Sequence, residues 1–364
     1  MGDEVTLKIL VDIGHPAHVH LFRNAAKALE EKGHKIKFTT RDKESAIALL
    51  KAYGFDYTVR GDLKAGMLGK AAGILSTDWR IYRAARDFRP DLFFGVHNPY
   101  TAHVSRIMRK KSITFTDTEG VKIASALTFP FTDTIITPDC FLERIDPKKH
   151  VRVAGYKELA YLHPSRFTPD PSVPEELGIA KGEPYVILRF ISWAASHDVG
   201  LCGIAKGTEL EYVRKLEEHG RVLITSERPL AAGLAKYRIT VSPEKIHSLL
   251  YYADLYIGEG GTMAAESAVL GTPAIHIEAN SRGVATGNFS GNFLELRDRY
   301  GLLYFYPDQN RAMEKAEEIL AEKNSKALWS KKREKLLSEK EDVTAWLTDF
   351  IDRYPESFYR KRSS

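Results

Sequence analysis

Short apolar runs alternate with amphipathic segments along the whole chain. The first two runs, at 7–13 and 34–40, are separated by a segment whose apolar positions recur at helical spacing. This succession of strand and helix continues to residue 153 and begins again at residue 185. Strands that alternate with helices form parallel sheets covered on both faces. The pattern therefore predicts an α/β protein built from doubly wound, Rossmann-like layers.

A proline-rich, polar stretch at 161–184 interrupts this pattern and predicts a linker. We expect a Rossmann-like N-terminal domain over 5–160 and a second over 185–325. Residues 326–364 are expected to form C-terminal helices and a basic tail. A chain of 364 residues is long enough to bury two such cores.

The most informative stretch spans residues 249–280. An apolar strand ends in the turn Gly-Glu-Gly-Gly at 258–261, and Thr262 is expected to cap the helix that follows. A glycine turn that opens a helix presents backbone N–H groups to an anion such as phosphate. Glu266, about one turn into this helix, can accept hydrogen bonds from a ribose diol. The dinucleotide fingerprint lacks its third glycine here, so a plain turn with a solvated glutamate is the alternative.

This stretch resembles the C-terminal-domain signature of GT-B nucleotide-sugar enzymes. It is similar to the lipid-linked GlcNAc transferase of peptidoglycan synthesis and, more loosely, to non-hydrolysing UDP-GlcNAc 2-epimerases. The wider chain looks closest to a domain-of-unknown-function family, common in archaea, that is grouped with GT-B folds. The resemblance implies two Rossmann-like domains facing across a cleft, with a C-terminal helix crossing back. It also implies that Glu266 binds the uridine ribose and that the amides around Gly260, Gly261 and Thr262 face the diphosphate.

The loop after the first strand of the second domain touches the donor diphosphate in GT-B enzymes. Arg189, Ser192 and His197 are the corresponding candidates here, with Arg228 in reserve, because arginine can bind phosphate oxygens at two points. The alternative is a surface loop. The epimerases carry a T-x-H-R order in this loop, and that order is absent from this chain.

The turn after the first strand, Gly-His-Pro-Ala-His-Val-His, is similar to a histidine-containing loop that faces the cleft in the peptidoglycan transferase. His15 and His18 are the counterparts, as a general base or a diphosphate contact. Helix capping is one alternative. A metal site that includes His20 is another, but no carboxylate or thiolate stands beside these histidines, so we expect no metal.

Two further strand ends carry polar residues. His97 and Asn98 follow one strand, and Asp117 and Glu119 follow the next. On a parallel sheet these residues gather at one edge, where carboxylates and a histidine suit acid–base work. We expect His97 and Asn98 on the acceptor side and a catalytic base among the carboxylates. Helix capping by Asp117 is the alternative.

The composition narrows the partners and the compartment. A net charge of +5 suits anionic ligands but does not by itself make a nucleic-acid footprint, so we expect no nucleic acid. Two separate cysteines, and no signal peptide or apolar span, predict a cytoplasmic protein. The basic, amphipathic segment 60–89 is either a surface helix or a peripheral contact with the inner face of a membrane.

Together these features predict a metal-independent, inverting glycosyltransferase without a cofactor. Its donor would be a nucleotide sugar, with UDP the first choice, and its acceptor a glycan or a lipid carrier. Two alternatives remain at this point. One is a nucleotide-sugar 2-epimerase on the same fold, and the other is a protein that binds a nucleotide sugar without turnover.

Overall fold

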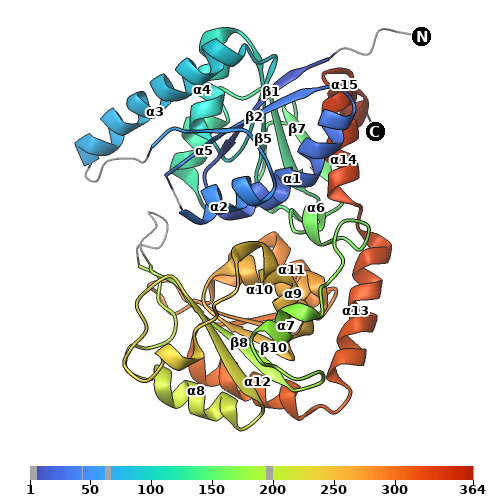
Figure 1. Ribbon diagram of the computed structural model, residues 1–364. Coiled ribbons are helices and arrows are strands. Elements are labelled where there is room, and N and C mark those ends of the chain that lie inside the picture. The colour runs from blue at the N-terminus through green and yellow to red at the C-terminus, as the bar shows by residue number, and fades with distance from the viewer. Residues whose placement is uncertain (1–5, 43, 62–66, 194–199, 364) are drawn as a thin grey trace. The chain divides into compact units, whose positions relative to one another are not determined.

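The computed structural model describes residues 6–42, 44–61, 67–193 and 200–363. The chain divides into two compact units (Figure 1). Unit 1 comprises residues 1–161 together with 341–364, and unit 2 comprises residues 162–340. Each unit is a parallel sheet with helices packed on both faces, as the alternation of apolar runs and amphipathic segments predicts.

Unit 1 holds a seven-stranded parallel sheet in the order β3-β2-β1-β4-β5-β6-β7. Its strands are β1 (Lys8–Ile13), β2 (Lys35–Thr40), β3 (Tyr57–Val59), β4 (Leu92–Val96), β5 (Lys111–Phe115), β6 (Thr134–Pro138) and β7 (His150–Val153). Central β1 pairs with β2 on one side and β4 on the other, and it is buried from Ile9 to Ile13. A strand covered on both faces reads as a continuous apolar run, which is why the sequence reveals β1.

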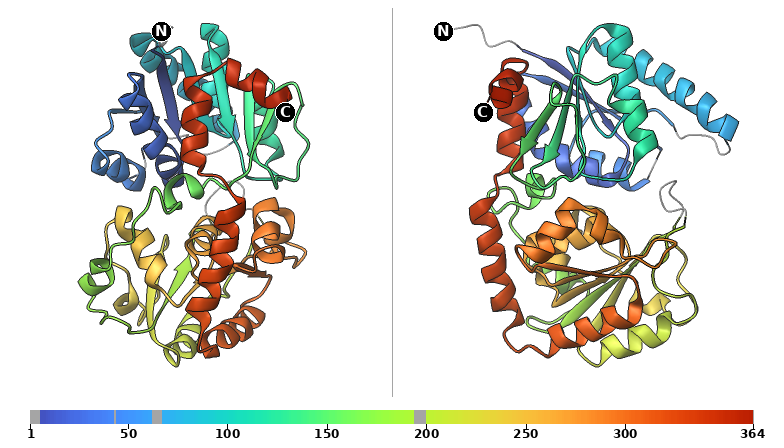
Figure 2. Two further views of the ribbon diagram at one scale, coloured as in Figure 1. Left: turned by 90° about the vertical axis from the view of Figure 1, so that its right-hand side faces the viewer. Right: turned by 180° about the vertical axis from the view of Figure 1, so that it is seen from behind.

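The helices of unit 1 come from both ends of the chain. They are α1 (Pro16–Glu31), α2 (Glu44–Ala52), α3 (Met67–Phe88), α4 (Pro99–Met108), α5 (Lys122–Thr128), α14 (Val343–Asp352) and α15 (Glu356–Ser363), while α6 (Leu159–Leu162) leads out of the unit. Helix α14 packs against α1 (Figures 1 and 2). Its Thr344 hydroxyl donates to the carbonyl of Ala160 over 2.6 Å. The predicted return of the C-terminal helix to the first domain is confirmed.

Unit 2 holds a five-stranded parallel sheet in the order β12-β11-β10-β8-β9. Its strands are β8 (Tyr185–Phe190), β9 (Arg221–Ser226), β10 (Leu255–Gly258), β11 (Ala274–Ile277) and β12 (Leu303–Tyr306). Its helices are α7 (Ser172–Glu176), α8 (Glu209–Glu217), α9 (Ile246–Tyr252), α10 (Gly261–Leu270), α11 (Gly291–Asp298), α12 (Gln309–Ala321) and α13 (Ser325–Glu339), with short 3-10 turns η1 (Ala235–Tyr237), η2 (Pro243–Lys245) and η3 (Thr286–Phe289).

Two features of unit 2 differ from the prediction. A short strand predicted to begin at Ile239 is wrong, because that residue follows a single bridge between Ile224 and Arg238 and leads into η2. The edge strand β12 was not predicted. Its exposure alternates between buried and half-buried, as an edge strand's does.

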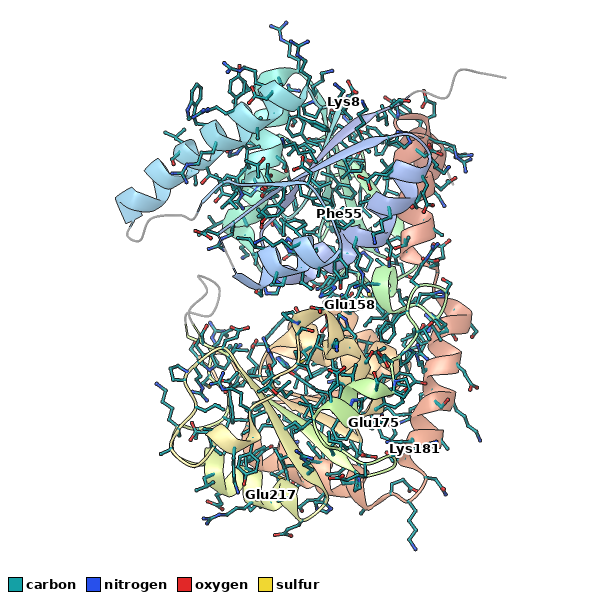
Figure 3. All side chains as sticks on the ribbon, viewed as in Figure 1. Lys8, Phe55, Glu158, Glu175, Lys181 and Glu217 are labelled. Atoms are coloured by element: carbon teal, nitrogen blue, oxygen red, sulfur yellow. The ribbon has the colours of Figure 1, made fainter. Side chains whose placement is uncertain are left out.

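The strands of the unit 1 sheet all begin at one end of the sheet and finish at the other. Lys8 begins β1 at one end, whereas Glu158 follows β7 at the other (Figure 3). Since all strands run in parallel, the residues that follow β1, β4, β5 and β7 collect at that second edge. None of the helices in the described part of the chain has the length and apolar character needed to cross a membrane.

Candidate functional site

The candidate donor residues of unit 2 lie at the point where the chain stops adding strands on one side of β8 and continues on the other. The chain passes from β8 to β9 on one side and then continues at β10 on the other side of β8. In open parallel sheets, ligands bind at the carboxyl ends of the strands beside such a switch point. Arg189 lies near the end of β8, and Ser192, Arg228 and Gly260 follow β8, β9 and β10, so the fold brings these segments to one end of the sheet.

The turn after β10 requires glycine at two positions. Gly258 has a φ of +145°, and a Cβ there would lie 2.4 Å from the carbonyl oxygen of Arg189. Gly260 has a φ of +88°, and a Cβ there would lie 2.9 Å from the Ile191 side chain. Gly260 is the N-cap residue of α10 and makes no side-chain hydrogen bond that would cap this helix. The prediction that Thr262 caps it is wrong, because α10 begins one residue before Thr262.

Glu259 ties this turn to the segments that follow β8. Its carboxylate is fully buried and accepts hydrogen bonds from the backbone N–H groups of Ile191 and Ile204, each over 2.9 Å. Burial raises the pKa of the Glu259 carboxyl, although both amide bonds act in the opposite direction. Glu259 therefore holds the glycine turn against the segment that follows β8, and its carboxylate is occupied by these backbone N–H groups.

Glu266 lies on α10 and is buried rather than solvated, with 5% of its surface exposed. Its Oε1 lies 3.1 Å from Nε2 of His247, which sits on the neighbouring helix α9 and is 1% exposed. The first-turn amides of α10 and the Glu266 carboxylate thus belong to one rigid helix. An anion at the helix start and a diol one turn further on would meet both groups.

The first predicted phosphate contact already has a partner within unit 2. Arg189 Nη2 donates to Oε1 of Glu227 over 2.5 Å, and Nη1 donates to the Thr225 hydroxyl over 3.3 Å. Ser192 donates to the other oxygen of Glu227 over 3.4 Å. The Arg189 guanidinium also lies against the glycine turn, since a Cβ on Gly260 would be 3.1 Å from Arg189 Nε. A phosphate bound here would compete with Glu227.

Arg228 is held in a similar way. Its Nη2 lies 3.6 Å from Oε1 of Glu209, and its guanidinium carbon lies 5.0 Å from the centre of the Phe190 ring. His197, another predicted donor contact, lies outside the described residues.

In unit 1 the corresponding switch point lies between β1 and β4. His15 caps α1, because its Nδ1 accepts a hydrogen bond from the backbone N–H of Ala17 over 3.2 Å. His18 Nδ1 accepts from the N–H of Gly14, also over 3.2 Å. The two ring centres are 6.0 Å apart. Since Nδ1 is the acceptor in both rings, each neutral imidazole carries its proton on Nε2 and is a donor there.

Both predicted acceptor-side residues serve the scaffold after β4. His97, with a φ of +44°, lies between the Thr116 hydroxyl, 2.8 Å from Nδ1, and the Ser125 hydroxyl, 3.0 Å from Nε2. Burial lowers its pKa. Asn98 caps α4 by accepting from the N–H of Thr101 over 3.1 Å, and its Nδ2 donates to buried Asp12 over 2.5 Å.

The two predicted carboxylates after β5 have different surroundings. Asp117 is 7% exposed, and its Oδ2 lies 2.6 Å from the ammonium of Lys157, which is also 3.4 Å from Oε1 of Glu158. Burial alone would lower the pKa of Lys157, but the two carboxylates outweigh it and raise this pKa well above its usual value. Glu119 is half-buried, and its Oε1 accepts from the N–H of Leu142 over 3.2 Å.

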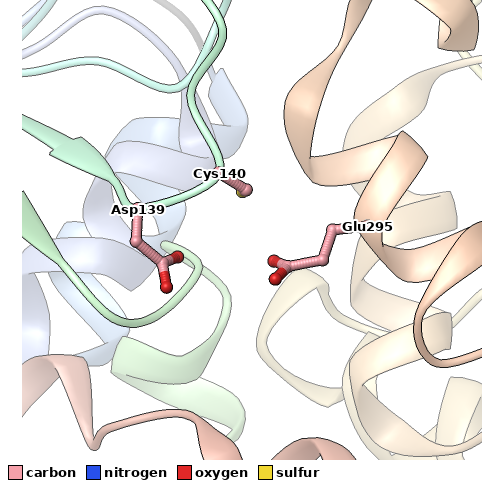
Figure 4. Close-up of side chains that lie close together, drawn as sticks. All are labelled: Asp139, Cys140 and Glu295. Atoms are coloured by element: carbon pink, nitrogen blue, oxygen red, sulfur yellow. The ribbon is translucent and has the colours of Figure 1, made fainter.

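Three potential metal ligands do not belong to either site. Asp139 and Cys140 follow β6 in unit 1, whereas Glu295 lies on α11 of unit 2 (Figure 4). Because they come from different units, we assign them no role. The third histidine of the first turn, His20, stacks on Tyr161, with ring centres 5.2 Å apart.

The structure adds residues that the sequence pattern does not reveal. Three of them contact a predicted residue from another element, namely His247, Glu227 and Lys157. The fourth, Glu259, ties the glycine turn to the backbone of Ile191 and Ile204. The nearest signal is the apolar strand before Glu259, which places a carboxylate directly after a buried run. The other three contacts depend on packing between elements distant in sequence.

The profile of the family described as "Protein of unknown function (DUF354)" matches residues 7–285. The chain belongs to the DUF354 family. One relative of this DUF354 protein is an uncharacterized protein of Methanocaldococcus jannaschii. That protein is 25% identical over 293 residues, which cover 74% of this chain and 82% of the relative.

Solved structures similar to this DUF354 protein include glycosyltransferases and a protein described as a UDP-N-acetylglucosamine 2-epimerase. A protein of Listeria monocytogenes described as a UDP-N-acetylglucosamine 2-epimerase has a TM-score of 0.67 at 13% identity, over 98% of this chain and 97% of that one. The spinosyn rhamnosyltransferase SpnG has a TM-score of 0.63 at 13% identity, over 94% and 100%. A Streptomyces glycosyltransferase complexed with thymidine diphosphate has a TM-score of 0.62 at 13% identity, over 95% and 99%. These likenesses confirm the predicted GT-B fold.

Proposed function

We propose that this DUF354 protein is a metal-independent glycosyltransferase that moves a sugar from a nucleotide-sugar donor to a glycan or lipid-linked acceptor, with inversion. The observation that carries the proposal is the switch point of unit 2. There, α10 begins at a glycine turn whose N-cap residue, Gly260, supplies no side-chain cap, and the helix bears the buried carboxylate of Glu266 one turn further on. This arrangement suits a nucleoside diphosphate.

The donor site follows from these groups. The amides around Gly260, Gly261 and Thr262 bind the diphosphate, and Glu266 accepts from the ribose hydroxyls. Arg189 exchanges Glu227 for a phosphate oxygen, with Ser192 beside it. Arg228 is a further candidate for a phosphate contact. We expect the nucleotide to be UDP. Preorganised N–H groups at a helix start stabilise the charge that develops on the departing diphosphate without a metal or a cofactor.

The catalytic base comes from unit 1. His15 and His18, when neutral, offer Nε2–H as a donor, which suits contact with an anion better than proton abstraction. Asp117 would give up its ion pair with Lys157 on taking a proton. We therefore assign the base to Glu119. Replacing Glu119 by Gln is expected to lower kcat about a hundredfold or more while nucleotide binding is retained.

A peripheral membrane contact through 60–89 accompanies the lipid-linked acceptor. On α3, Leu75 and Trp79 are 71% and 59% exposed, and the exposed Arg83 and Arg86 follow on the same helix. Exposed apolar side chains next to arginines suit the interface of an anionic bilayer. Co-sedimentation with vesicles that contain phosphatidylglycerol tests this contact, and the Leu75→Ser, Trp79→Ser double variant should lose it.

A nucleotide-sugar 2-epimerase is the second candidate, favoured by the likeness to the Listeria protein over nearly the full length of both chains. Interconversion of two UDP-sugars without an acceptor would support it. Tight binding without any turnover would instead support a protein that only binds the nucleotide sugar.

The decisive test is nucleotide binding by the wild type and by Glu266→Ala. Thermal shifts are recorded with UDP, GDP, dTDP and CDP and with their sugars, because binding to the folded state raises Tm. We expect one nucleotide to stabilise the wild type and the variant to lose that shift. That donor is then incubated with and without acceptors. If no nucleotide shifts the wild type, the proposed function is wrong.

A further inference from the structure

His247 and Glu266 form a buried pair on two neighbouring helices of unit 2. The imidazole Nε2 lies 3.1 Å from the carboxylate Oε1, and the two residues are 1% and 5% exposed. The Phe167 ring meets the imidazole edge-on, with ring centres 6.2 Å apart. A carboxylate buried to this extent needs a donor or a cation beside it, and the His247 imidazole lies within ion-pair distance of it.

The helix that carries His247 is firmly attached to its surroundings. The Tyr185 hydroxyl, from β8, donates to the carbonyl of Leu249 over 2.6 Å. The Thr272 hydroxyl, just beyond α10, donates to the carbonyl of Leu250 over 2.7 Å. These bonds fix α9 against the sheet and against the end of α10. The imidazole is therefore a rigid support for the Glu266 side chain.

We infer that His247 is a positioning residue for ribose recognition, and that the site selects ribonucleoside diphosphates over their 2′-deoxy counterparts. This inference rests on the proposed function. A carboxylate has about four acceptor positions on two oxygens, so Glu266 can accept from the imidazole and from both hydroxyls of a diol. Fixing its rotamer aims the remaining positions at the ribose. A 2′-deoxyribose leaves one of them unmatched in a buried site.

The test compares binding constants for UDP, GDP and their 2′-deoxy forms, measured by calorimetry on the full chain. The wild type should bind the better ribonucleotide about ten- to a hundredfold more tightly than its 2′-deoxy form, as expected for one hydrogen bond to a charged group. His247→Asn, which stays polar but is too short to reach Glu266, should reduce this preference to about threefold or less. His247→Gln, whose amide can still donate, should retain most of it.

The matched control is His276→Asn, which alters the other histidine that is almost fully buried in the described part of unit 2, on β11. It should leave the preference unchanged. An unchanged preference in His247→Asn, or an equal loss for both sugar types, overturns the positioning role. A wild type that binds both sugar types equally overturns the selection, and this measurement needs no variant to fold. A wild type that binds no nucleotide overturns the proposed function as well, whereas loss of UDP binding in Glu266→Ala alone leaves that function standing.

Discussion

Both units place the start of a helix at the switch point of their sheet, but the two helix ends are satisfied differently. In unit 1, α1 begins with Pro16, which has no N–H, and His15 accepts from the N–H of Ala17. In unit 2, α10 follows Gly260, which has no side chain to offer. Unit 1 therefore uses a side chain of its own to complete the turn, whereas the N-cap residue of α10 in unit 2 supplies no side-chain hydrogen bond.

A half-buried histidine of unit 1 and a buried histidine of unit 2 also differ in their hydrogen-bond partners. His97 of unit 1 lies between two hydroxyl groups, those of Thr116 and Ser125. Neither ring nitrogen of His276 in unit 2 has a hydrogen-bond partner within the described residues, and Glu278 is 3.7 Å away. These two histidines therefore differ in how the fold satisfies their ring nitrogens.

The largest expected effect is the loss of the polar network of unit 1. Asp12 is fully buried and accepts hydrogen bonds from Thr39, Arg60 and Asn98 over 2.6, 2.7 and 2.5 Å. Asp12→Ala leaves the buried Arg60 without this carboxylate, which should lower the free energy of unfolding by about 3–5 kcal/mol. Urea denaturation followed by circular dichroism measures this loss.

Asp87→Ala is the control for that variant, since its side chain is 73% exposed and 3.8 Å from Arg86. It should change the free energy of unfolding by less than about 0.5 kcal/mol. A loss below about 1 kcal/mol in Asp12→Ala would show that the network does not hold this edge of the sheet.

The strands and the glycine turn were predictable because each depends on local sequence. A buried parallel strand such as β1 is a continuous apolar run, and a turn such as 258–261 needs glycine for backbone reasons. Strand β12 was missed because, at a sheet edge, its half-exposed alternation is weak. The predicted strand after Arg238 failed because two β-branched residues next to a single bridge did not extend into a ladder.

The candidate site was less predictable, because its residues acquire partners from other elements. Sequence pattern placed Arg189 at a strand end but could not show that Glu227, from the end of the next strand, occupies its guanidinium. It placed Asp117 at another edge but could not show Lys157 beside it. Such pairs are set by sheet order, and the spacing along the chain carries no trace of them.

Lowering the pH should destabilise the folded protein through buried His276. Burial lowers the pKa of His276 from 6.5 to about 4. Below pH 6.5 the unfolded chain therefore takes up a proton that the folded protein does not, so this stability is complete above pH 6.5 and is lost as the pH falls towards 4. The loss is about 3 kcal/mol at most. In His276→Leu, the free energy of unfolding measured in urea should depend correspondingly less on pH between 7 and 4. An unchanged pH dependence would show that His276 does not contribute this loss of stability.

A carboxylate placed in the first turn of α10 should separate folding from binding. Thr262→Asp adds a negative charge where the helix dipole favours it, so stability should rise or stay within about 1 kcal/mol. The same charge would repel a diphosphate, and nucleotide affinity should fall at least about tenfold. Asn310→Asp, exposed in the first turn of α12, is the control and should leave affinity unchanged. Calorimetry with the nucleotide found by thermal shift decides between these results.

The smallest expected effect concerns the internal partner of Arg189. Glu227 is 40% exposed and competes with any phosphate for the guanidinium, so Glu227→Gln should free that group and increase nucleotide affinity up to about threefold. Glu209→Gln, which alters the partner of Arg228, is the matched control, because Arg228 lies on the Phe190 ring and not against the glycine turn. An increase for Glu227→Gln alone would place Arg189 in the phosphate site. A decrease would mean that Glu227 is needed to orient Arg189, and equal increases in both variants would reflect only the change in net charge.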